Sequence, residues 1–222
     1  MRFPFIGGPC RVGMQFMYTG IVQAMLPIAS LQKKPGLWTF SVVLPADLTG
    51  ELTLGASIAV NGTCFTVTAM AAAEVWFDAI AETLALTNLK NIQVGTLVNI
   101  ERSARANAEV GGHVLSGHVV DTATVVNIEN TENNRRITFR GRSDWMKYVF
   151  SKGYLALNGA SLTIAAVNQQ EFAVNLIPET LRRTNFALLQ IDDPVNVEID
   201  QQTQVIVDTV ERVMAERVAS TT

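Results

Sequence analysis

Four side chains of this sequence are best suited to chemistry: the thiol of Cys64, the imidazole of His118, the amine of Lys152 and the hydroxyl of Ser161. A thiolate is a nucleophile, and an imidazole exchanges protons near neutral pH. Their spacing is informative, because Ser161 follows Cys64 by 97 positions. The same step leads from Ile21 to His118, and also from Gly55 to Lys152. We therefore expect two similar pockets that carry different reactive groups.

The step of 97 residues is an internal repeat that runs through most of the chain. Four pairs of segments keep it: Asn61-Gly62 and Asn158-Gly159, Glu82-Thr83-Leu84 and Glu179-Thr180-Leu181, Thr87-Asn88 and Thr184-Asn185, Val98-Asn99 and Val195-Asn196. Solenoid repeats are roughly 20 to 50 residues long, so a longer period indicates a duplicated domain. We predict one domain over 17–113, a second over 114–202, a C-terminal helix and tail over 203–222, and a disordered extension over 1–16.

Short runs rich in valine, isoleucine, threonine and phenylalanine predict β-strands in both copies. In the first copy the runs are Leu37 to Leu44, Ser57 to Met70, Val75 to Ile80 and Leu97 to Glu101. In the second copy they are Arg136 to Arg140, Tyr154 to Val167, Phe172 to Ile177 and Val195 to Ile199. The Asn-Gly pairs inside two of these runs indicate tight turns or bulges. Many short strands with few helical stretches predict an all-β fold with a small closed barrel in each half.

Three short segments favour helical turns, and one long segment favours a helix. The short ones are Ala81 to Leu86, Glu179 to Arg183 and Ser143 to Phe150. The long one runs from Gln201 to about Val218 behind an N-cap at Asp200, with apolar residues along one side: Val205, Ile206, Val210, Val213, Met214 and Val218. A helix added to two complete barrels has no core of its own to cover. Its apolar stripe is therefore expected to meet the same helix in other subunits, with packing onto its own second barrel as the alternative.

The composition excludes several classes of partner. The net charge of −3 argues against nucleic acid or an anionic membrane, because both require a concentrated basic face. No run approaches the roughly 20 apolar residues that span a bilayer, so a soluble chain is expected. The two cysteines, Cys10 and Cys64, are predicted to be free thiols in a reducing cytoplasm.

Each candidate residue also has a simpler interpretation. His113 and His118 are the two histidines of the chain, but an odd separation in a strand places side chains on opposite faces, and no third ligand follows at a suitable spacing. We therefore predict no metal site. We expect His113 to order the glycine-rich link and His118, in the first strand of the second repeat, to be a general acid or base. Cys64 alone fits a core position, although its polar counterpart Ser161 favours a pocket for both. Lys152 alone fits an exposed surface.

Five segments together carry a family resemblance: Met17 to Val22, Ser57 to Thr68, Gly111 to His118, Asn158 to Thr163 and Ile177 to Leu181. They resemble riboflavin synthase of the single-chain type with two lumazine-binding repeats. The resemblance covers Met17 to about Val218. Tyr18 departs from the usual phenylalanine of that family, and Asn158 replaces a frequent aspartate.

The resemblance implies a fold, a reaction and an assembly. The fold is two tandem homologous Greek-key six-stranded β-barrels with a C-terminal oligomerisation α-helix. The reaction is a transfer of a four-carbon unit between two molecules of 6,7-dimethyl-8-ribityllumazine, which yields riboflavin and 5-amino-6-(D-ribitylamino)uracil without a cofactor or metal. Each barrel binds one lumazine. The chain forms a homotrimer through its C-terminal helix, and the catalytic site lies between the first barrel of one subunit and the second barrel of another.

The resemblance also implies two sets of substrate-binding residues. We expect the first-barrel pocket to contain Gly20, Ile21, Val22, Ser57, Cys64, Phe65, Thr66, Asp78, Ala79, Ile80, Ala81, Glu82 and Thr83. We expect the second-barrel pocket to contain His118, Lys152, Ser161, Leu162, Thr163, Ile177, Pro178, Glu179, Thr180, Leu181 and Arg182. The backbone groups around Thr83 and Thr180 are candidates for reading the edge of a heterocycle.

The resemblance gives the candidate catalytic residues distinct roles. His118 is the candidate for proton transfer. Cys64, or a water that it positions, is the candidate nucleophile at C7 of a lumazine, and Ser161 is expected to polarise the partner ring. Lys152 completes the set of catalytic candidates.

Two other functions remain as alternatives. A non-catalytic lumazine- or flavin-binding antenna protein has the same fold but loses reactive positions, whereas this chain keeps all four. The flavin-binding barrel of reductases normally precedes a nucleotide-binding domain, but here a second barrel follows and no G-x-G-x-x-G motif succeeds a strand.

Overall fold

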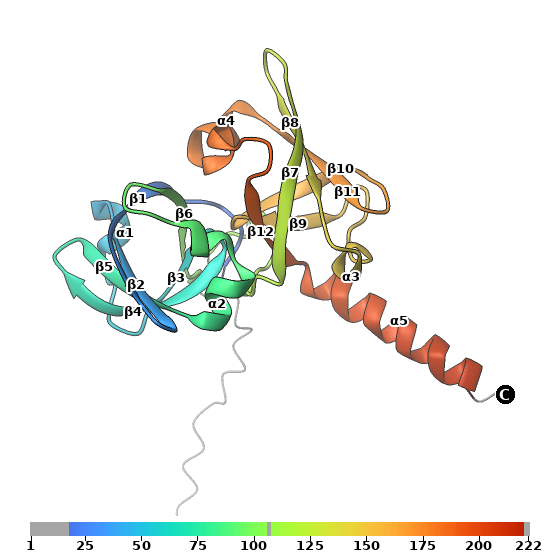
Figure 1. Cartoon of the computed structure of the whole chain (residues 1–222), viewed down its shortest axis with the longest axis horizontal. Coiled ribbons are helices and arrows are strands. Elements are labelled where there is room, and N and C mark those ends of the chain that lie inside the picture. The colour runs from blue at the N-terminus through green and yellow to red at the C-terminus, as the bar shows by residue number, and fades with distance from the viewer. Residues whose placement is uncertain (1–17, 106–107, 220–222) are drawn as a thin grey trace, which may run out of the picture.

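The computed structural model describes residues 18–105 and 108–219. Over these residues twelve strands close into two antiparallel barrels of six strands each (Figure 1). The first barrel contains β1 (Ala24–Lys34), β2 (Leu37–Val43), β3 (Ser57–Val60), β4 (Thr63–Ala71), β5 (Glu74–Ile80) and β6 (Leu97–Arg102). The second contains β7 (Asp121–Asn130), β8 (Arg135–Arg140), β9 (Tyr154–Leu157), β10 (Ala160–Val167), β11 (Glu171–Leu176) and β12 (Pro194–Ile199). The predicted fold class is therefore confirmed.

Both barrels have the same strand order and the same irregularities. The first closes in the order β1-β2-β5-β4-β3-β6, and the second follows the equivalent order. Four register shifts interrupt the ladders, near Ile28, Val67, Val125 and Ile164, and they form two pairs that are 97 residues apart. Such bulges bend a strand so that a sheet can close. The repeat thus preserves backbone geometry as well as residue types.

Alternating side chains fill each barrel. Along β5, Val75, Phe77 and Ala79 are buried, whereas Asp78 and Ile80 face outward. This period of two is the pattern of a strand with one face on the core. The predicted runs recovered ten strands but covered neither β1 nor β7. The extension 1–16, with Cys10, lies outside the described residues.

The two Asn-Gly pairs form the tight turns between β3 and β4 and between β9 and β10. Asn61 and Gly62 have φ of 46° and 77°, and Asn158 and Gly159 have φ of 43° and 80°. Positive φ at both central residues is the signature of a type I′ hairpin. The turns meet at the barrel contact, where a Cβ on Gly62 would stand 2.6 Å from the Gly159 nitrogen. Glycine is required here because the two backbones touch.

Six asparagines join the barrels around these turns: Asn61, Asn88, Asn99, Asn158, Asn185 and Asn196. The side chain of Asn196 donates to the Asn61 carbonyl at 2.8 Å, and that of Asn99 donates to the Asn158 carbonyl at 2.9 Å. The backbone N–H of Asn88 donates to Oδ1 of Asn196 at 2.7 Å. Each turn is therefore held by the opposite barrel.

Asn196→Ala is expected to lower the free energy of unfolding by about 2 to 4 kcal/mol, because it leaves the Asn61 carbonyl and the Asn88 N–H without these partners. The matched control is Asn127→Ala, at an exposed position whose side chain donates to the exposed carboxylate of Glu129. That change should stay within about 0.5 kcal/mol. Urea unfolding of the three proteins measures both values. Equal midpoints for Asn196→Ala and the wild type would contradict the structural role of the network.

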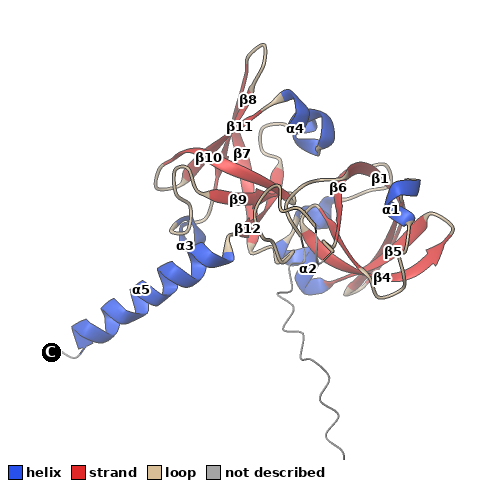
Figure 2. Cartoon of the chain, turned by 180° about the vertical axis from the view of Figure 1, so that it is seen from behind, coloured by secondary structure: helices blue, strands red, loops and turns tan. Residues whose placement is uncertain are grey.

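Short helices lie at the ends of the strands, and one long helix leaves the barrels. The short ones are α1 (Ala46–Thr49), α2 (Ala81–Leu86), η1 (Asn88–Asn91), α3 (Ser143–Met146), α4 (Pro178–Arg183) and η2 (Asn185–Leu188). The long one is α5 (Gln201–Ala219), which projects away from the second barrel (Figures 1 and 2). Asp200 caps it as predicted, since its Oδ2 accepts from the Thr203 N–H at 3.0 Å.

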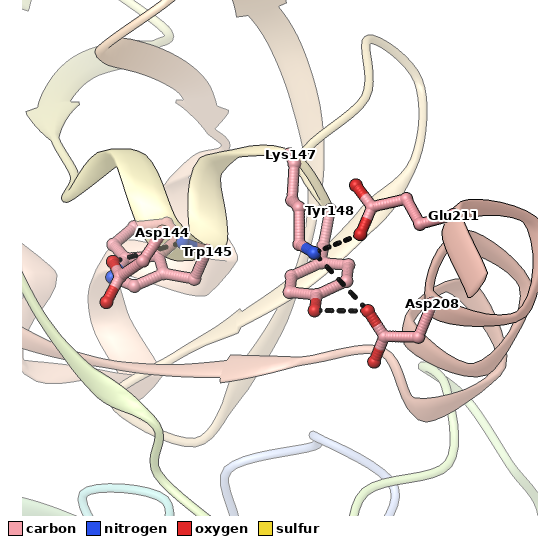
Figure 3. Close-up of polar contacts among 6 residues, drawn as sticks. All are labelled: Asp144, Trp145, Lys147, Tyr148, Asp208 and Glu211. Carbon is pink, nitrogen blue, oxygen red and sulfur yellow. Dashed lines mark hydrogen bonds and ion pairs between the residues drawn. The ribbon is translucent and has the colours of Figure 1, made fainter. Parts of the chain in front are cut away.

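The apolar stripe of α5 does not pack onto the second barrel. Its residues Val205, Ile206, Val210, Val213, Met214 and Val218 are between 41% and 70% exposed. The alternative that the helix folds back on its own barrel is therefore wrong. The polar side is held instead: Lys147 Nζ lies 2.5 Å from Glu211 Oε2, and the Tyr148 hydroxyl donates to Asp208 at 2.6 Å (Figure 3).

Candidate active site

Two short segments cross from one barrel to the other. We call residues 18–22, before β1, arm A, and residues 115–119, before β7, arm B. Tyr18 and Leu115 pair the two arms through backbone hydrogen bonds of 3.0 and 2.9 Å. Val22 of arm A packs in the core of the second barrel. Each repeat thus supplies a segment to the opposite barrel.

Each arm ends on a candidate site residue of the opposite barrel. The Gly20 carbonyl accepts the N–H of Ser161 on β10 at 2.9 Å. The Gly117 carbonyl accepts the N–H of Cys64 on β4 at 3.0 Å. Both glycines have positive φ, 75° and 77°.

The crossing corrects the composition of the two predicted pockets. Gly20, Ile21 and Val22 were expected beside Cys64, but arm A lies against Ser161 in the second barrel. His118 was expected beside Ser161, but Gly117 places arm B on β4 next to Cys64. His118 is also not in a strand, because β7 begins at Asp121. The backbone of arm B therefore places His118 one residue from the contact with Cys64.

Cys64 lies under the crossing of the arms. The Tyr18 hydroxyl donates to Cys64 Sγ at 3.2 Å. Tyr18 is 1% exposed, and its burial, followed by the hydrogen bond to Cys64, raises the pKa of its hydroxyl far above the ordinary value. Tyr18 therefore stays protonated and acts as a donor to the sulfur.

Ser161 has a different partner. Its hydroxyl lies 2.6 Å from His113 Nδ1, and the imidazole stacks on Tyr154 with centroids 5.5 Å apart. Burial lowers the pKa of His113, while the charge of Asp200 acts in the opposite direction. His113 thus contacts a site residue, which the sequence did not indicate. The neutral ring can serve as donor or acceptor to Ser161.

The strand period decides which predicted residues can present a side chain to a ligand. Cys64, Thr66, Asp78 and Ile80 in the first barrel, and Ser161, Thr163 and Ile177 in the second, are partly or fully exposed. Phe65, Ala79 and Leu162 point into the cores and are at most 9% exposed. Alternation explains this difference, because neighbours in a strand face opposite sides. These three residues can reach a ligand only through their backbones.

The Glu-Thr-Leu segments offer fewer free backbone groups than expected. The Thr83 carbonyl accepts both the N–H and the hydroxyl of Thr87, and the Thr180 carbonyl accepts the same pair from Thr184. Both lone pairs of each carbonyl are thus occupied. Glu179 forms ion pairs with Arg182 and Arg183, which lower the pKa of its carboxyl.

Lys152 adopts a backbone conformation that normally belongs to glycine. Its φ is 67°, and its counterpart Gly55 has a φ of 84°. Their N–H groups make equivalent bonds, to Ile164 and Val67. A lysine in the left-handed region carries strain of about 1 kcal/mol, and such strain clusters at functional sites. The side chain is exposed, which leaves its amine accessible.

Two buried glutamates anchor the arms, and the sequence reasoning missed them. Glu101 on β6 and Glu198 on β12 are each 4% exposed and 97 residues apart. Burial raises the pKa of Glu101 to about 7, although hydrogen bonds from Thr19 and Gly20 act in the opposite direction. Burial also raises the pKa of Glu198. The sequence did contain a signal for them: an acidic residue stands near the end of an apolar run in both repeats, at the spacing of 97 residues.

The Glu101 carboxyl is expected to give stability its own pH dependence. Its ordinary pKa is 4.5, so between pH 4.5 and 7 the folded chain binds more protons than the unfolded chain. Stability from this group is present below pH 4.5 and is lost as pH rises through about 7. Relative to Glu101→Gln, the wild type should lose at most about 3 kcal/mol over this window. Urea unfolding from pH 4.5 to 8 tests this, and parallel curves would contradict the raised pKa.

Two cavities lie at the junction of the arms and barrels. One of about 800 Å³ is lined by arm A, α1 and part of the link, and includes Ile21 but neither Cys64 nor Ser161. Another of about 410 Å³ lies at the asparagine network. Over residues 18–105 and 108–219, no three His, Cys, Asp or Glu side chains gather as a metal ion would require. In that same part of the chain, no helix is long and apolar enough to span a bilayer.

Comparison with known proteins identifies the family. A model of the lumazine binding domain matches residues 19–103 and again 116–200. Riboflavin synthase of Escherichia coli is 47% identical over 202 residues, which cover 90% of this chain and 95% of the relative. The chain belongs to the riboflavin synthase family. Riboflavin synthase of Buchnera aphidicola from Schizaphis graminum is 38% identical, over 92% of this chain and 99% of the relative. The resemblance seen in the sequence is thus confirmed.

Solved structures in complex with ligands have the same two-barrel fold as this family member. LumP complexed with 6,7-dimethyl-8-(1′-D-ribityl)lumazine has a TM-score of 0.76 at 26% identity, and the match covers 83% of this chain and all of LumP. LumP complexed with riboflavin has a TM-score of 0.77 at 26% identity. Both ligands are ones that the sequence led us to expect in a lumazine pocket.

Proposed function

We propose that this protein is a riboflavin synthase, a transferase that moves a four-carbon unit between two molecules of 6,7-dimethyl-8-ribityllumazine. The products are riboflavin and 5-amino-6-(D-ribitylamino)uracil. The observation that carries the proposal is the crossed pair of arms over Cys64 and Ser161. It creates two equivalent places with different chemistry, and a reaction between two identical molecules requires both properties. Two near-equal pockets hold the partners together and save the entropy of their encounter.

The two arms carry different side chains. Gly117 of arm B, which bonds Cys64, is followed by His118, whereas Gly20 of arm A, which bonds Ser161, is followed by Ile21. One lumazine must lose a proton from its C7 methyl group, and the other must accept a nucleophile at C7. His118 takes the proton, and Cys64, or a water that it positions, supplies the nucleophile. Ser161, supported by His113, polarises the second ring, and Lys152 adds a positive charge.

The site is proposed to be complete only in an assembly. Cys64, Thr66, Ser161 and Thr163 are partly or fully exposed in the single chain. The exposed stripe of α5 supports a homotrimer, in which the first barrel of one subunit faces the second barrel of another. We place the two pockets in domains 17–113 and 114–202, although each receives the arm of the other repeat. We place the trimer in the cytoplasm.

Riboflavin formation from dimethylribityllumazine tests the function directly. The purified protein should produce riboflavin, and Cys64→Ser and His118→Gln should each lower the rate by about tenfold or more. Thr68→Ser, on the exposed face of β4, should retain the wild-type rate. Wild-type rates in both site variants would refute their roles. Tight binding without product would favour the antenna protein, whose possibility the LumP likeness supports.

A further inference from the structure

The two buried glutamates have no cationic partner in the described chain. Glu101 and Glu198 are absent from the ion pairs found over residues 18–105 and 108–219. A carboxylate that loses its water is costly unless several donors replace the solvent. Here the donors come from the arms.

Each glutamate receives three donors from the arm of its own repeat. Glu101 accepts the N–H of Thr19 at 2.7 Å, the hydroxyl of Thr19 at 2.9 Å and the N–H of Gly20 at 3.1 Å. Glu198 accepts the N–H of Ser116 at 2.7 Å, the hydroxyl of Ser116 at 2.8 Å and the N–H of Gly117 at 3.1 Å. Three donors on one carboxyl group therefore hold each arm in place.

A single glycine separates each glutamate from a site residue. The N–H of Gly117 is held by Glu198, and its carbonyl is held by the N–H of Cys64. A Cβ on Gly117 would stand 2.6 Å from Cβ of Cys64, so there is no room for a side chain between the two residues. Gly20 connects Glu101 to Ser161 in the same way, with 2.5 Å to Cβ of Ser161. Movement of either carboxylate must therefore move an arm relative to its site residue.

The residue after each glycine is the one that differs between the repeats. His118 follows Gly117 and is exposed, and Ile21 follows Gly20 and is 46% exposed. Both side chains are thus accessible from solvent, next to a backbone segment that is hydrogen-bonded to a buried glutamate.

We propose that Glu198 and Glu101 are positioning residues that act crosswise. Glu198, in the second barrel, sets His118 against Cys64 of the first barrel. Glu101, in the first barrel, sets arm A, through Gly20, against Ser161 of the second barrel. The proposal rests on the proposed function for its catalytic consequence, but its geometric part stands on the contacts alone.

A double-mutant cycle separates positioning from general support of the fold. Glu198→Gln keeps the size of the side chain but turns an NH₂ toward the arm or loses one acceptor oxygen. It should lower kcat for riboflavin formation by roughly tenfold in the wild type, but by less than about threefold in a His118→Gln background. Glu101→Gln should lower kcat by the same factor in both backgrounds. If Glu198→Gln lowered kcat by the same factor in both backgrounds, Glu198 would have only a structural role, and the proposal would be overturned.

The histidine signals provide a second readout that does not depend on turnover. The chain has two histidines, so protein labelled with ¹³C-histidine should give two imidazole signals, assigned with His118→Gln. Glu198→Gln should shift the His118 signal. Glu101→Gln should shift the His113 signal, because His113 bonds Ser161. Shifts in the opposite pairing, or no shifts, would overturn the crosswise arrangement even if the wild type made no riboflavin, an outcome that would refute the function separately.

Milder variants cover the case in which a glutamine variant does not fold. Ser116→Ala removes one donor to Glu198, and Thr19→Ala removes one donor to Glu101. Ser116→Ala should shift the His118 signal in the same way as Glu198→Gln but by less. Thr19→Ala should shift the His113 signal in the same way as Glu101→Gln but by less. Ser116→Ala with an unchanged His118 signal and an additive cycle would overturn the proposal.

Discussion

Ile206→Asp combined with Val213→Asp is expected to dissociate the proposed trimer and to lower riboflavin formation by roughly a hundredfold or more. The two side chains are 64% and 41% exposed and lie on one side of α5, since seven residues make about two turns. Charges buried between helices are costly, so the assembled state is lost while each barrel keeps its core. In the proposed assembly the activity falls because the two lumazines no longer meet between subunits.

Light scattering and turnover measure the two effects on the same samples. Ala215→Asp is the control for position, because it adds one carboxylate to the same helix nine residues after Ile206, about half a turn away from the stripe. It should leave mass and rate unchanged. The contacts of Lys147 and Tyr148 with Asp208 and Glu211 hold the polar side and are not altered by the double change (Figure 3). A trimeric, active double variant would show that another surface joins the subunits.

Gly117→Ala is expected to lower the free energy of unfolding by about 3 kcal/mol or more and to abolish most turnover. The residue has a φ of 77°, where a side chain costs about 1 to 2 kcal/mol. A Cβ would also meet Cβ of Cys64 at 2.6 Å and the Tyr18 ring at 2.9 Å, and such overpacking costs about 1 to 3 kcal/mol. Arm B must move away from Cys64, and His118 moves with it.

Gly36→Ala separates the two causes. Gly36 has a φ of 76°, but no atom of the described chain lies within 4 Å of the place that a Cβ would occupy, so this variant carries the backbone strain without the clash. It should cost about 1 to 2 kcal/mol and retain the wild-type rate. Urea unfolding and riboflavin formation compare the variants. Equal losses of stability in the two would mean that contact with Cys64 is unimportant.

The repeat made much of the fold predictable. Runs with apolar alternation located ten strands, because burial on one face imposes a period of two. The same pattern did not locate β1, where Pro27 interrupts the apolar run. It also missed β7, where polar residues such as Asn127 weaken the alternation of apolar and polar residues. The Asn-Gly pairs correctly indicated turns, because positive φ at both positions is rare in other sequences. The six-asparagine network was not foreseen, although its members were noted as repeat markers.

The candidate site was predicted residue by residue but not pocket by pocket. Alignment of the copies identifies Cys64, His118 and Ser161, because a chemical mismatch is visible in the sequence. The alignment also assigns each arm to the barrel of its own repeat. That assignment is unsupported, because the spacing of residues contains no information on which barrel a segment contacts. The hydrogen bonds of Gly20 with Ser161 and of Gly117 with Cys64 reverse that assignment. Only three-dimensional contacts could show it.

The exchange of arms gives the molecule the design of a homodimer whose two chains have been joined end to end. Gly62 and Gly159 approach each other reciprocally, and Asn99 and Asn196 each donate to the opposite turn, as equivalent residues do in an isologous interface. In a true homodimer, positions 21 and 118 would be the same residue, encoded once, and both sites would be identical. Joining the chains removes that constraint and also keeps the halves at high effective concentration. A gene fusion of this kind would therefore have allowed one half to acquire an imidazole while the other kept an isoleucine.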